Sequence, residues 1–305
     1  MSTQKGSDMK LFKGKNAGLN LSTETDISSR IIEETQALSK KYSELGINHP
    51  EGVWTRKHLK TIRFDKFRED NVYVWQTRMY NEINFFISYL YCQRIDKLEL
   101  RDKIKENGDF GVETYLVDGK TISRDFIDSL IEVNYLEEML HISQIPNLHV
   151  LDIGAGYGRL ARRITEAFPE VHITCLDAIP TSTCISKIYL EKEIQANRVT
   201  VRGLDTIAEI PKGQIRVALN VHSFSEMSLA SVSEWVGLLV DKEIPDVFVV
   251  PNGEALTLND GTDFGFLFKD AGYRIVDRRS KYQGDGFSKF GIYPSTYFLL
   301  HRTFP

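Results

Sequence analysis

The sequence predicts an α/β fold: a mostly parallel sheet of seven strands that ends in an antiparallel pair, preceded by a helical N-terminal region. Two observations lead to this class. Between residues 149 and 271, short apolar runs alternate with amphipathic helical patterns, the order that builds a parallel sheet with crossover helices on both faces. The last two apolar runs have no helical pattern between them, which favours an antiparallel pair closing the sheet.

Length and composition limit the function classes. The chain has 305 residues, 42% of them hydrophobic, which is enough to fill a globular core. Its formal net charge of −4 offers no basic face for nucleic acid. The three cysteines lack the even number and the spacing of a disulfide or zinc framework, so we expect a cytoplasmic protein. No apolar run approaches the roughly 20 residues of a membrane span.

Three regions are expected along the chain. A polar tail with few large apolar groups comes first, a region of helical patterns follows, and the α/β domain completes the chain. The expected boundaries are 1–25 for a flexible tail, 26–120 for a helical region that roofs the domain, and 121–305 for the α/β domain.

Helical periodicity places the first elements. Apolar residues recur at helical spacing from Asp26 to about Leu45, and Asp26 or Ser22 is the expected cap of this helix. The run 71–100 is dense in aromatic residues and predicts one or two buried helices. Ser123 is the expected cap of a further amphipathic helix, which leads directly to the α/β domain.

The elements of the α/β domain follow from the alternation of patterns. The expected strands are 149–153, 171–177, 198–202, 215–221, 246–250, 273–279 and 297–303. The expected helices are 159–168, about 181–196, 228–240 and 262–271. The segment between the last two strands is expected to be a loop without a helix.

The stretch VLDIGAGYGRL, residues 150–160, predicts a strand, a tight turn and the start of a helix. The turn contains three glycines, Gly154, Gly156 and Gly158. A dinucleotide-binding loop needs a small residue at position 159, and Arg159 stands there, so the spacing disfavours a dinucleotide. The glycines still let the backbone approach a ligand, and the free N–H groups of the helix start favour a carboxylate.

With Asp152 at its head, this motif resembles the first motif of the class I S-adenosylmethionine-dependent methyltransferases, whose Rossmann-like sheet also ends in an antiparallel hairpin. The resemblance covers roughly residues 120–305 and implies S-adenosylmethionine (SAM) as cofactor. The three glycines would then border its methionine part, and Asp152 would orient its amino group. Asp177, at the end of the second strand, matches the residue that accepts from the ribose hydroxyls, and Asp205, after the third strand, matches the acidic position beside the adenine amine.

The fourth strand ends in ALNVHSFSEM, at the sheet edge where ligands of such folds bind. We expect Asn220 beside the cofactor, and His222 and Glu226 towards the transferred methyl group. A hydroxyl acceptor must lose its proton, and His222 is the first candidate base, with Glu226 orienting it or binding a second hydroxyl. In the alternative interpretation, His222 caps the next helix and Glu226 lies on its exposed face. A divalent metal ion held by Glu226, His222 and Asp285 is a third interpretation that no spacing supports.

Further motifs are similar to those of a family of sugar O-methyltransferases. They are NVHSFSEM, FGVETYLVDGKTISRDFIDSLIEVNYL and IYPSTYFLLHR, and they extend the resemblance to most of residues 70–305. The resemblance implies a sugar or glycan acceptor. The side chains compatible with a glycan, most of which we expect in the core, are Trp75, Tyr80, Asn84, Tyr282, Tyr293 and Tyr297. The segment 280–294, rich in glycine, is the expected acceptor-side loop.

Two other functions stay open from the sequence. One is methyl transfer to a small acceptor that is not a sugar, such as a phenol or an amine. The other is a non-catalytic SAM-binding module, whose helical region and tail dock a larger assembly. The patterns do not predict an oligomeric state.

Overall fold

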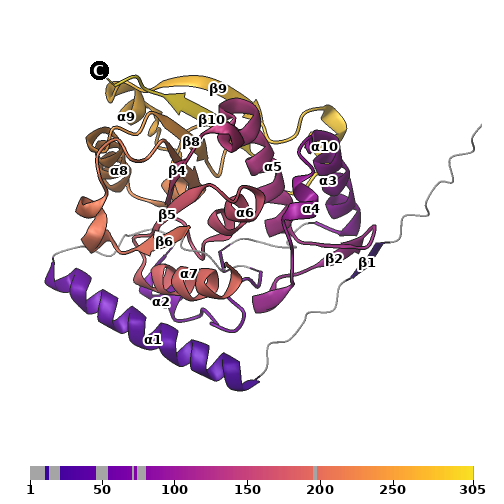
Figure 1. Cartoon of the computed structure of the whole chain (residues 1–305), viewed down its shortest axis with the longest axis horizontal. Coiled ribbons are helices and arrows are strands. Elements are labelled where there is room, and N and C mark those ends of the chain that lie inside the picture. The colour runs from indigo at the N-terminus through magenta and orange to yellow at the C-terminus, as the bar shows by residue number, and fades with distance from the viewer. Residues whose placement is uncertain are drawn as a thin grey trace, which may run out of the picture.

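The computed structural model describes residues 11–13, 21–45, 54–70, 72–73, 80–194 and 198–304. A twisted sheet runs through the molecule with helices on both faces, and the N-terminal helix α1 lies along one flank (Figure 1). The strand order is β6-β5-β4-β7-β8-β10-β9. The predicted α/β class, with its seven-stranded, mostly parallel sheet and N-terminal helical region, is confirmed.

The strands of this sheet fall within two residues of their predicted bounds. They are β4 (His149–Ile153), β5 (His172–Leu176), β6 (Val199–Arg202), β7 (Val217–Val221), β8 (Asp246–Val250), β9 (Arg274–Ser280) and β10 (Thr296–His301). The first five pair in parallel, whereas β10 is antiparallel to both β8 and β9. The antiparallel end of the sheet is therefore as predicted.

Successive strand residues point to opposite faces, so two separate cores form. Val150 belongs to the core under α5, α6 and α7, and its neighbour Leu151 belongs to the core under α8 and α9. The same alternation separates Val217 from Ala218. The central strand β8 is covered on both faces and buried along its whole length, whereas the edge strand β9 carries several charged residues and is largely exposed.

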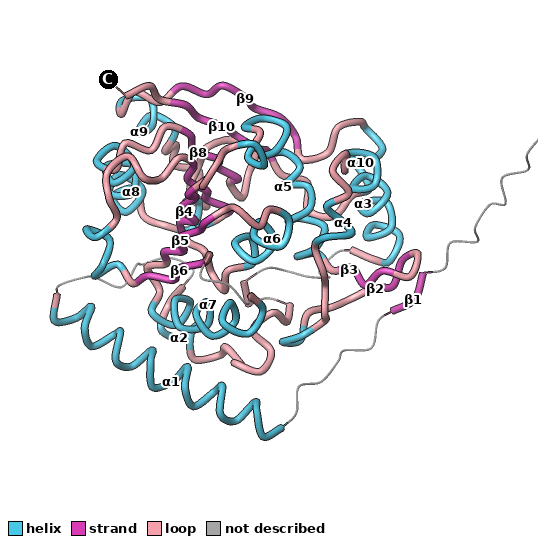
Figure 2. The backbone as a smooth tube through the Cα atoms, viewed as in Figure 1, coloured by secondary structure: helices cyan, strands magenta, loops and turns pink. Residues whose placement is uncertain are grey.

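The helices of the domain are α5 (Arg124–Leu140), α6 (Arg159–Ala167), α7 (Pro180–Glu193), α8 (Leu229–Asp241) and α9 (Gly265–Asp270). The predicted cap of α5 is confirmed, since the Ser123 side chain accepts from the Phe126 N–H. Helices and strands alternate along the tube as parallel crossover connections require (Figure 2).

The N-terminal region contributes the helices α1 (Leu21–Glu44), α2 (Arg56–Leu59), α3 (Glu82–Ile95) and α4 (Leu100–Lys103). It also holds a small antiparallel sheet of β1 (Leu11–Lys13), β2 (Tyr115–Val117) and β3 (Lys120–Ile122). Helix α1 packs on α7. It begins five residues earlier than predicted, so Ser22 and Asp26 lie within the helix, and the prediction that either caps it is wrong. The expected boundaries of the three regions stay a prediction.

The loop between β9 and β10 also differs from the expectation, because it contains the short helix α10 (Asp285–Phe290). The Phe287 ring of this helix packs 5.1 Å from the Tyr91 ring of α3. Its residues carry no helical apolar pattern of their own, so this tertiary contact accounts for the helix. Within the described ranges, no helix has the length and apolarity needed to cross a membrane.

Candidate active site

The glycine turn between β4 and α6 brings the backbone close to two neighbouring segments. Gly154, at φ 68°, donates its N–H to the Leu176 carbonyl at the end of β5, 2.8 Å away. A Cβ atom at Gly154 would lie 2.0 Å from Ser223 Oγ. Position 154 therefore requires glycine both for its left-handed backbone and for its distance from Ser223.

Asp177 closes the far side of the same turn. Its two carboxylate oxygens accept from the Gly156 N–H at 2.9 Å and from the Ile179 N–H at 2.8 Å. Despite these bonds, burial raises the pKa of Asp177 to about 7. The carboxylate is thus held just after the end of β5, beside the glycine turn.

Asp152, in β4, carries an unsatisfied oxygen. The residue is 3% exposed, and among the described residues its Oδ2 atom has no hydrogen-bond partner. Burial raises the pKa of Asp152 to about 7. An isolated buried carboxyl group is costly, and it favours a ligand that brings a hydrogen-bond donor or a positive charge.

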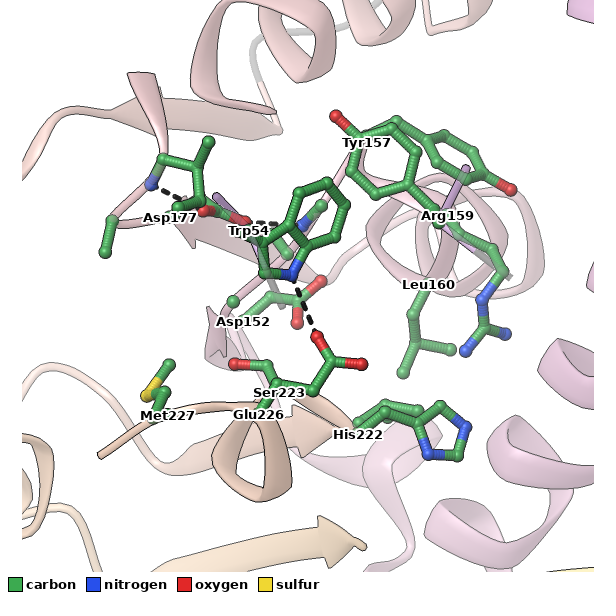
Figure 3. A pocket seen from close by; sticks show the side chains of 17 residues that line it. Trp54, Asp152, Tyr157, Arg159, Leu160, Asp177, His222, Ser223, Glu226 and Met227 are labelled. Carbon is green, nitrogen blue, oxygen red and sulfur yellow. Dashed lines mark hydrogen bonds between the residues drawn. The ribbon is translucent and has the colours of Figure 1, made fainter. Parts of the chain in front are cut away.

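A cavity of about 110 Å³ lies at this edge of the sheet. Figure 3 shows that side chains from the glycine turn, from the segment after β7 and from the N-terminal region converge on it. The predicted site residues that line it are Asp152, Gly154, Gly156, Asp177, His222 and Glu226. Residues from the ends of three adjacent strands are therefore brought together, as parallel strands allow.

Three predicted site residues do not line the cavity. Asn220 is fully buried, and its side chain donates to the Ile153 carbonyl and accepts from the Phe224 N–H. Gly158 is required for packing, because a Cβ there would lie 2.6 Å from Leu190 Cδ1. Asp205 forms an ion pair with Lys41 of α1. In this structure these three residues belong to the surroundings of the cavity and not to its lining.

His222 has an unusual backbone and an unsatisfied ring. It is a non-glycine residue at φ 68°, a conformation that costs about 1–3 kcal/mol and is concentrated at functional sites. Its Nδ1 atom is buried without a hydrogen-bond partner among the described residues. Burial, helped by the Arg124 guanidinium, lowers the pKa of His222 to about 3. The imidazole is therefore neutral near pH 7 and a weaker base than an ordinary histidine.

Glu226 differs from His222 in the direction of its pKa shift. It lies at the end of the 3-10 helix Ser223–Glu226, and its Oε2 atom accepts from the Trp54 Nε1–H at 2.8 Å. Burial raises the pKa of Glu226 above that of an ordinary glutamate. A raised pKa brings a carboxylate closer to the range in which it accepts a proton from an acceptor hydroxyl.

Several lining residues were not predicted from the sequence. They are Trp54, Tyr73, Tyr157 and Met227, together with Arg159, whose role was predicted only as the exclusion of a dinucleotide. Ser223, which was expected to project towards the transferred methyl group with His222 and Glu226, also lines the cavity. Arg159 turns out to bind Glu132 of α5 through its Nη1 atom at 2.8 Å. The large Arg159 side chain fits at this position because its guanidinium extends away from the turn towards α5. Trp54 is a single aromatic residue in a polar stretch, without periodicity to draw attention to it.

The side chains that were compatible with a glycan separate into two groups. Tyr282 and Tyr297 are each 1% exposed and belong to the core. Asn84, in the first turn of α3, accepts from the N–H of the cap residue Asn81 and donates to the Phe290 carbonyl. Tyr80 and Tyr293 are half-buried, and the Tyr293 ring contacts the His222 ring edge-on at 5.4 Å. Trp75 lies outside the described residues.

No group of three or more His, Cys, Asp or Glu side chains that could hold a metal ion occurs in the described part of the chain. The proposed combination of His222, Glu226 and Asp285 is thus not assembled as a metal site. Asp285 is instead the exposed first residue of α10.

Comparison with known proteins gives a likeness of fold. No protein-family model and no curated protein matches the chain. The chain is similar in structure to the [4+2]-cyclase SpnF, with 13% identity over 60% of this chain and 83% of that chain and a TM-score of 0.45. It is also similar to magnesium protoporphyrin IX methyltransferase ChlM from Synechocystis PCC 6803 with bound SAH, with 14% identity, 59% and 86% coverage and a TM-score of 0.44. The chain is similar as well to the mitomycin 7-O-methyltransferase MmcR, with 21% identity over 52% of this chain and 49% of that chain and a TM-score of 0.40. Likenesses of this size leave the activity to be argued from the residues of the cavity.

Proposed function

We propose that the protein is a SAM-dependent O-methyltransferase that transfers a methyl group to a hydroxyl of a sugar or glycan. The observation that carries the donor half of this proposal is the pair of buried carboxyl groups, Asp152 and Asp177, on either side of a glycine turn. Both have a pKa of about 7 because they are buried, so each favours a ligand with hydrogen-bond donors.

The chemistry of these groups fits the two ends of SAM. The unpartnered Oδ2 atom of Asp152 suits the amino group of the methionine part. Asp177 keeps lone pairs for the ribose hydroxyls beside the backbone bonds it already accepts. SAM supplies an activated methyl group on a sulfonium that leaves readily, so the protein itself must align the acceptor and take its proton.

The acceptor half of the proposal rests on the segment after β7. Glu226 is a half-buried carboxyl group with a raised pKa, and it lines the cavity. We assign it as the group that takes the acceptor's proton, at Oε1 or Oε2. His222, with a pKa of about 3, is a weaker base and is assigned to orienting the acceptor hydroxyl as a neutral imidazole. This reverses the order that the sequence favoured.

A sugar acceptor is supported by the sequence motifs and by two half-buried tyrosines, of which Tyr293 contacts the His222 ring. Tyr293 and Tyr80 combine an apolar ring with a hydroxyl, the pair of properties that suits a ring carrying several hydroxyl groups. Amines need less help from a base than hydroxyls do. A carboxyl group with a raised pKa that lines the cavity, Glu226, therefore favours an oxygen acceptor.

The proposal is tested by transfer of labelled methyl from SAM to a panel of nucleotide sugars, glycosides and finished glycans, with phenols and amines beside them. We expect labelled product with at least one sugar and none with the phenols and amines. Product only with phenols or amines would contradict the sugar acceptor. No product with any acceptor, from a protein that does bind SAM, would favour the non-catalytic module.

A further inference from the structure

Trp54 of the N-terminal region is one of the side chains that line the cavity. Figure 3 shows its indole beside Asp152, with the Nε1–H directed at Glu226. The indole also packs against the Tyr73 ring, and the two ring centroids lie 5.0 Å apart. Tyr73 in turn donates to Ser182 Oγ at 3.1 Å, at the start of α7.

The space left beside the indole is too small for a nucleoside. Pockets for cofactor-sized ligands measure roughly 300–1,000 Å³, whereas this cavity measures about 110 Å³. The carboxyl groups of Asp152 and Asp177 nevertheless face it. A ligand that reaches both carboxyl groups must therefore take the place of the Trp54 side chain.

The hydrogen bond between Trp54 and Glu226 connects this displacement to the acceptor side. While the indole N–H donates to Oε2, that oxygen is engaged and is not available to an acceptor hydroxyl, although Glu226 lines the cavity. When the ring leaves, the half-buried Glu226 lacks this donor. A carboxylate that has lost a donor favours a new one, such as an acceptor hydroxyl.

We propose that Trp54 is a gate residue that SAM displaces on binding, and that its departure releases Glu226 for the acceptor. This inference rests on the proposed function, because it takes SAM as the occupant of the cavity. It goes further in that it predicts an order of binding. The donor enters first, and only then is the proton-accepting carboxylate available to a hydroxyl.

The gate is tested by the affinity for S-adenosylhomocysteine, measured by calorimetry on the full chain. Trp54→Phe keeps an aromatic ring but removes the N–H, so we expect binding roughly five- to tenfold tighter than in the wild type. Trp54→Ala also removes the ring and should bind at least as tightly as Trp54→Phe. Damage to the fold would weaken binding, so a gain in affinity reports on displacement and not on a structural defect.

A double-mutant cycle isolates the connection to Glu226. Glu226→Ala alone should tighten binding about as much as Trp54→Phe, because both remove the same hydrogen bond. The double variant should bind no more tightly than either single variant. Additive gains would show that the two residues act separately, and would overturn the coupling.

Trp235 provides a matched control. It is a buried tryptophan of α8, 7% exposed, in the core on the other face of the sheet. Trp235→Phe should leave the affinity unchanged. Equal or weaker binding by both Trp54 variants, relative to a wild type that binds, would overturn the gate and leave the proposed function standing. Binding by none of these proteins would overturn the proposed function, and the gate with it.

Discussion

Asp152→Asn replaces the buried carboxyl group by an amide of the same shape, and its effect on stability follows from the raised pKa. The carboxyl group has a pKa of about 7 in the folded protein and about 3.9 when unfolded. Between these two values the folded protein binds more protons than the unfolded chain. Stability is therefore retained below about pH 4 and lost as the pH rises towards and through 7.

The size of the effect follows from the same two pKa values. Between pH 5 and pH 8, ionisation of this group should lower the free energy of unfolding of the wild type by about 2.5 kcal/mol. The amide does not ionise, so Asp152→Asn should escape this loss. Any constant cost of the amide cancels when the two proteins are compared at several pH values.

Urea unfolding at half-unit steps from pH 5 to pH 8 measures this difference. We expect the stability of Asp152→Asn relative to the wild type to increase by about 2.5 kcal/mol across the range, most steeply below pH 7. A difference that stays constant over the range would refute the argument, because it would mean that Asp152 is not an unpaired buried carboxyl group.

Three further outcomes follow from the site. Gly154→Ala should lower the free energy of unfolding by more than the ~1–2 kcal/mol that a left-handed alanine costs, because its Cβ would lie 2.0 Å from Ser223 Oγ. Gly213 has a similar φ and open space around it, so Gly213→Ala measures the backbone cost alone. Equal losses of stability in the two variants would show that the contact at position 154 is not tight. The affinity for S-adenosylhomocysteine should rise roughly tenfold from pH 6 to pH 8 as Asp152 ionises, and a flat calorimetric profile would argue against its contact with the amino group. With an acceptor from the panel, Glu226→Gln should reduce kcat by roughly 10²–10⁴-fold and His222→Ala by less, and the opposite ranking would restore His222 as the base.

The sheet could be predicted closely because each of its strands carries its own signal. A strand buried on both faces is a short apolar run, as in DVFVV of β8, and its bounds follow from the polar residues around it. The order of strands and helices then limits the topology. Helix α10 has no such signal in its own residues. It packs on α3 through the contact of Phe287 with Tyr91, which the local sequence does not indicate.

The candidate site could be predicted only where position along the strand decides the outcome. Asp177 and Glu226 lie beyond the ends of β5 and β7 and reach the cavity, and Asp152, one residue before the end of β4, reaches it too. Asn220 lies one residue before the end of β7, and its side chain turns inwards to bind the backbone of two neighbouring segments. The position of Asn220 near the edge of the sheet could be predicted from the sequence, but the direction in which its side chain points could not.

Trp54 was beyond prediction for a different reason. Its partner Glu226 is 172 positions away in the chain, and no local pattern joins a single tryptophan to a carboxylate at that separation. The same holds for Lys41 and Asp205, which meet only because α1 packs on the domain. Contacts between the helical region and the α/β domain therefore had to come from the structure.

The central claim, that the cavity between Asp152 and Asp177 binds SAM, is tested most directly by calorimetric titration with S-adenosylhomocysteine. We expect one binding site per chain in the wild type, and binding at least tenfold weaker in Asp177→Ala, which removes both acceptor oxygens beside the glycine turn. Asp285→Ala, at the exposed start of α10, should leave the affinity unchanged. No heat of binding in the wild type, or equal affinity in Asp177→Ala, would contradict the claim.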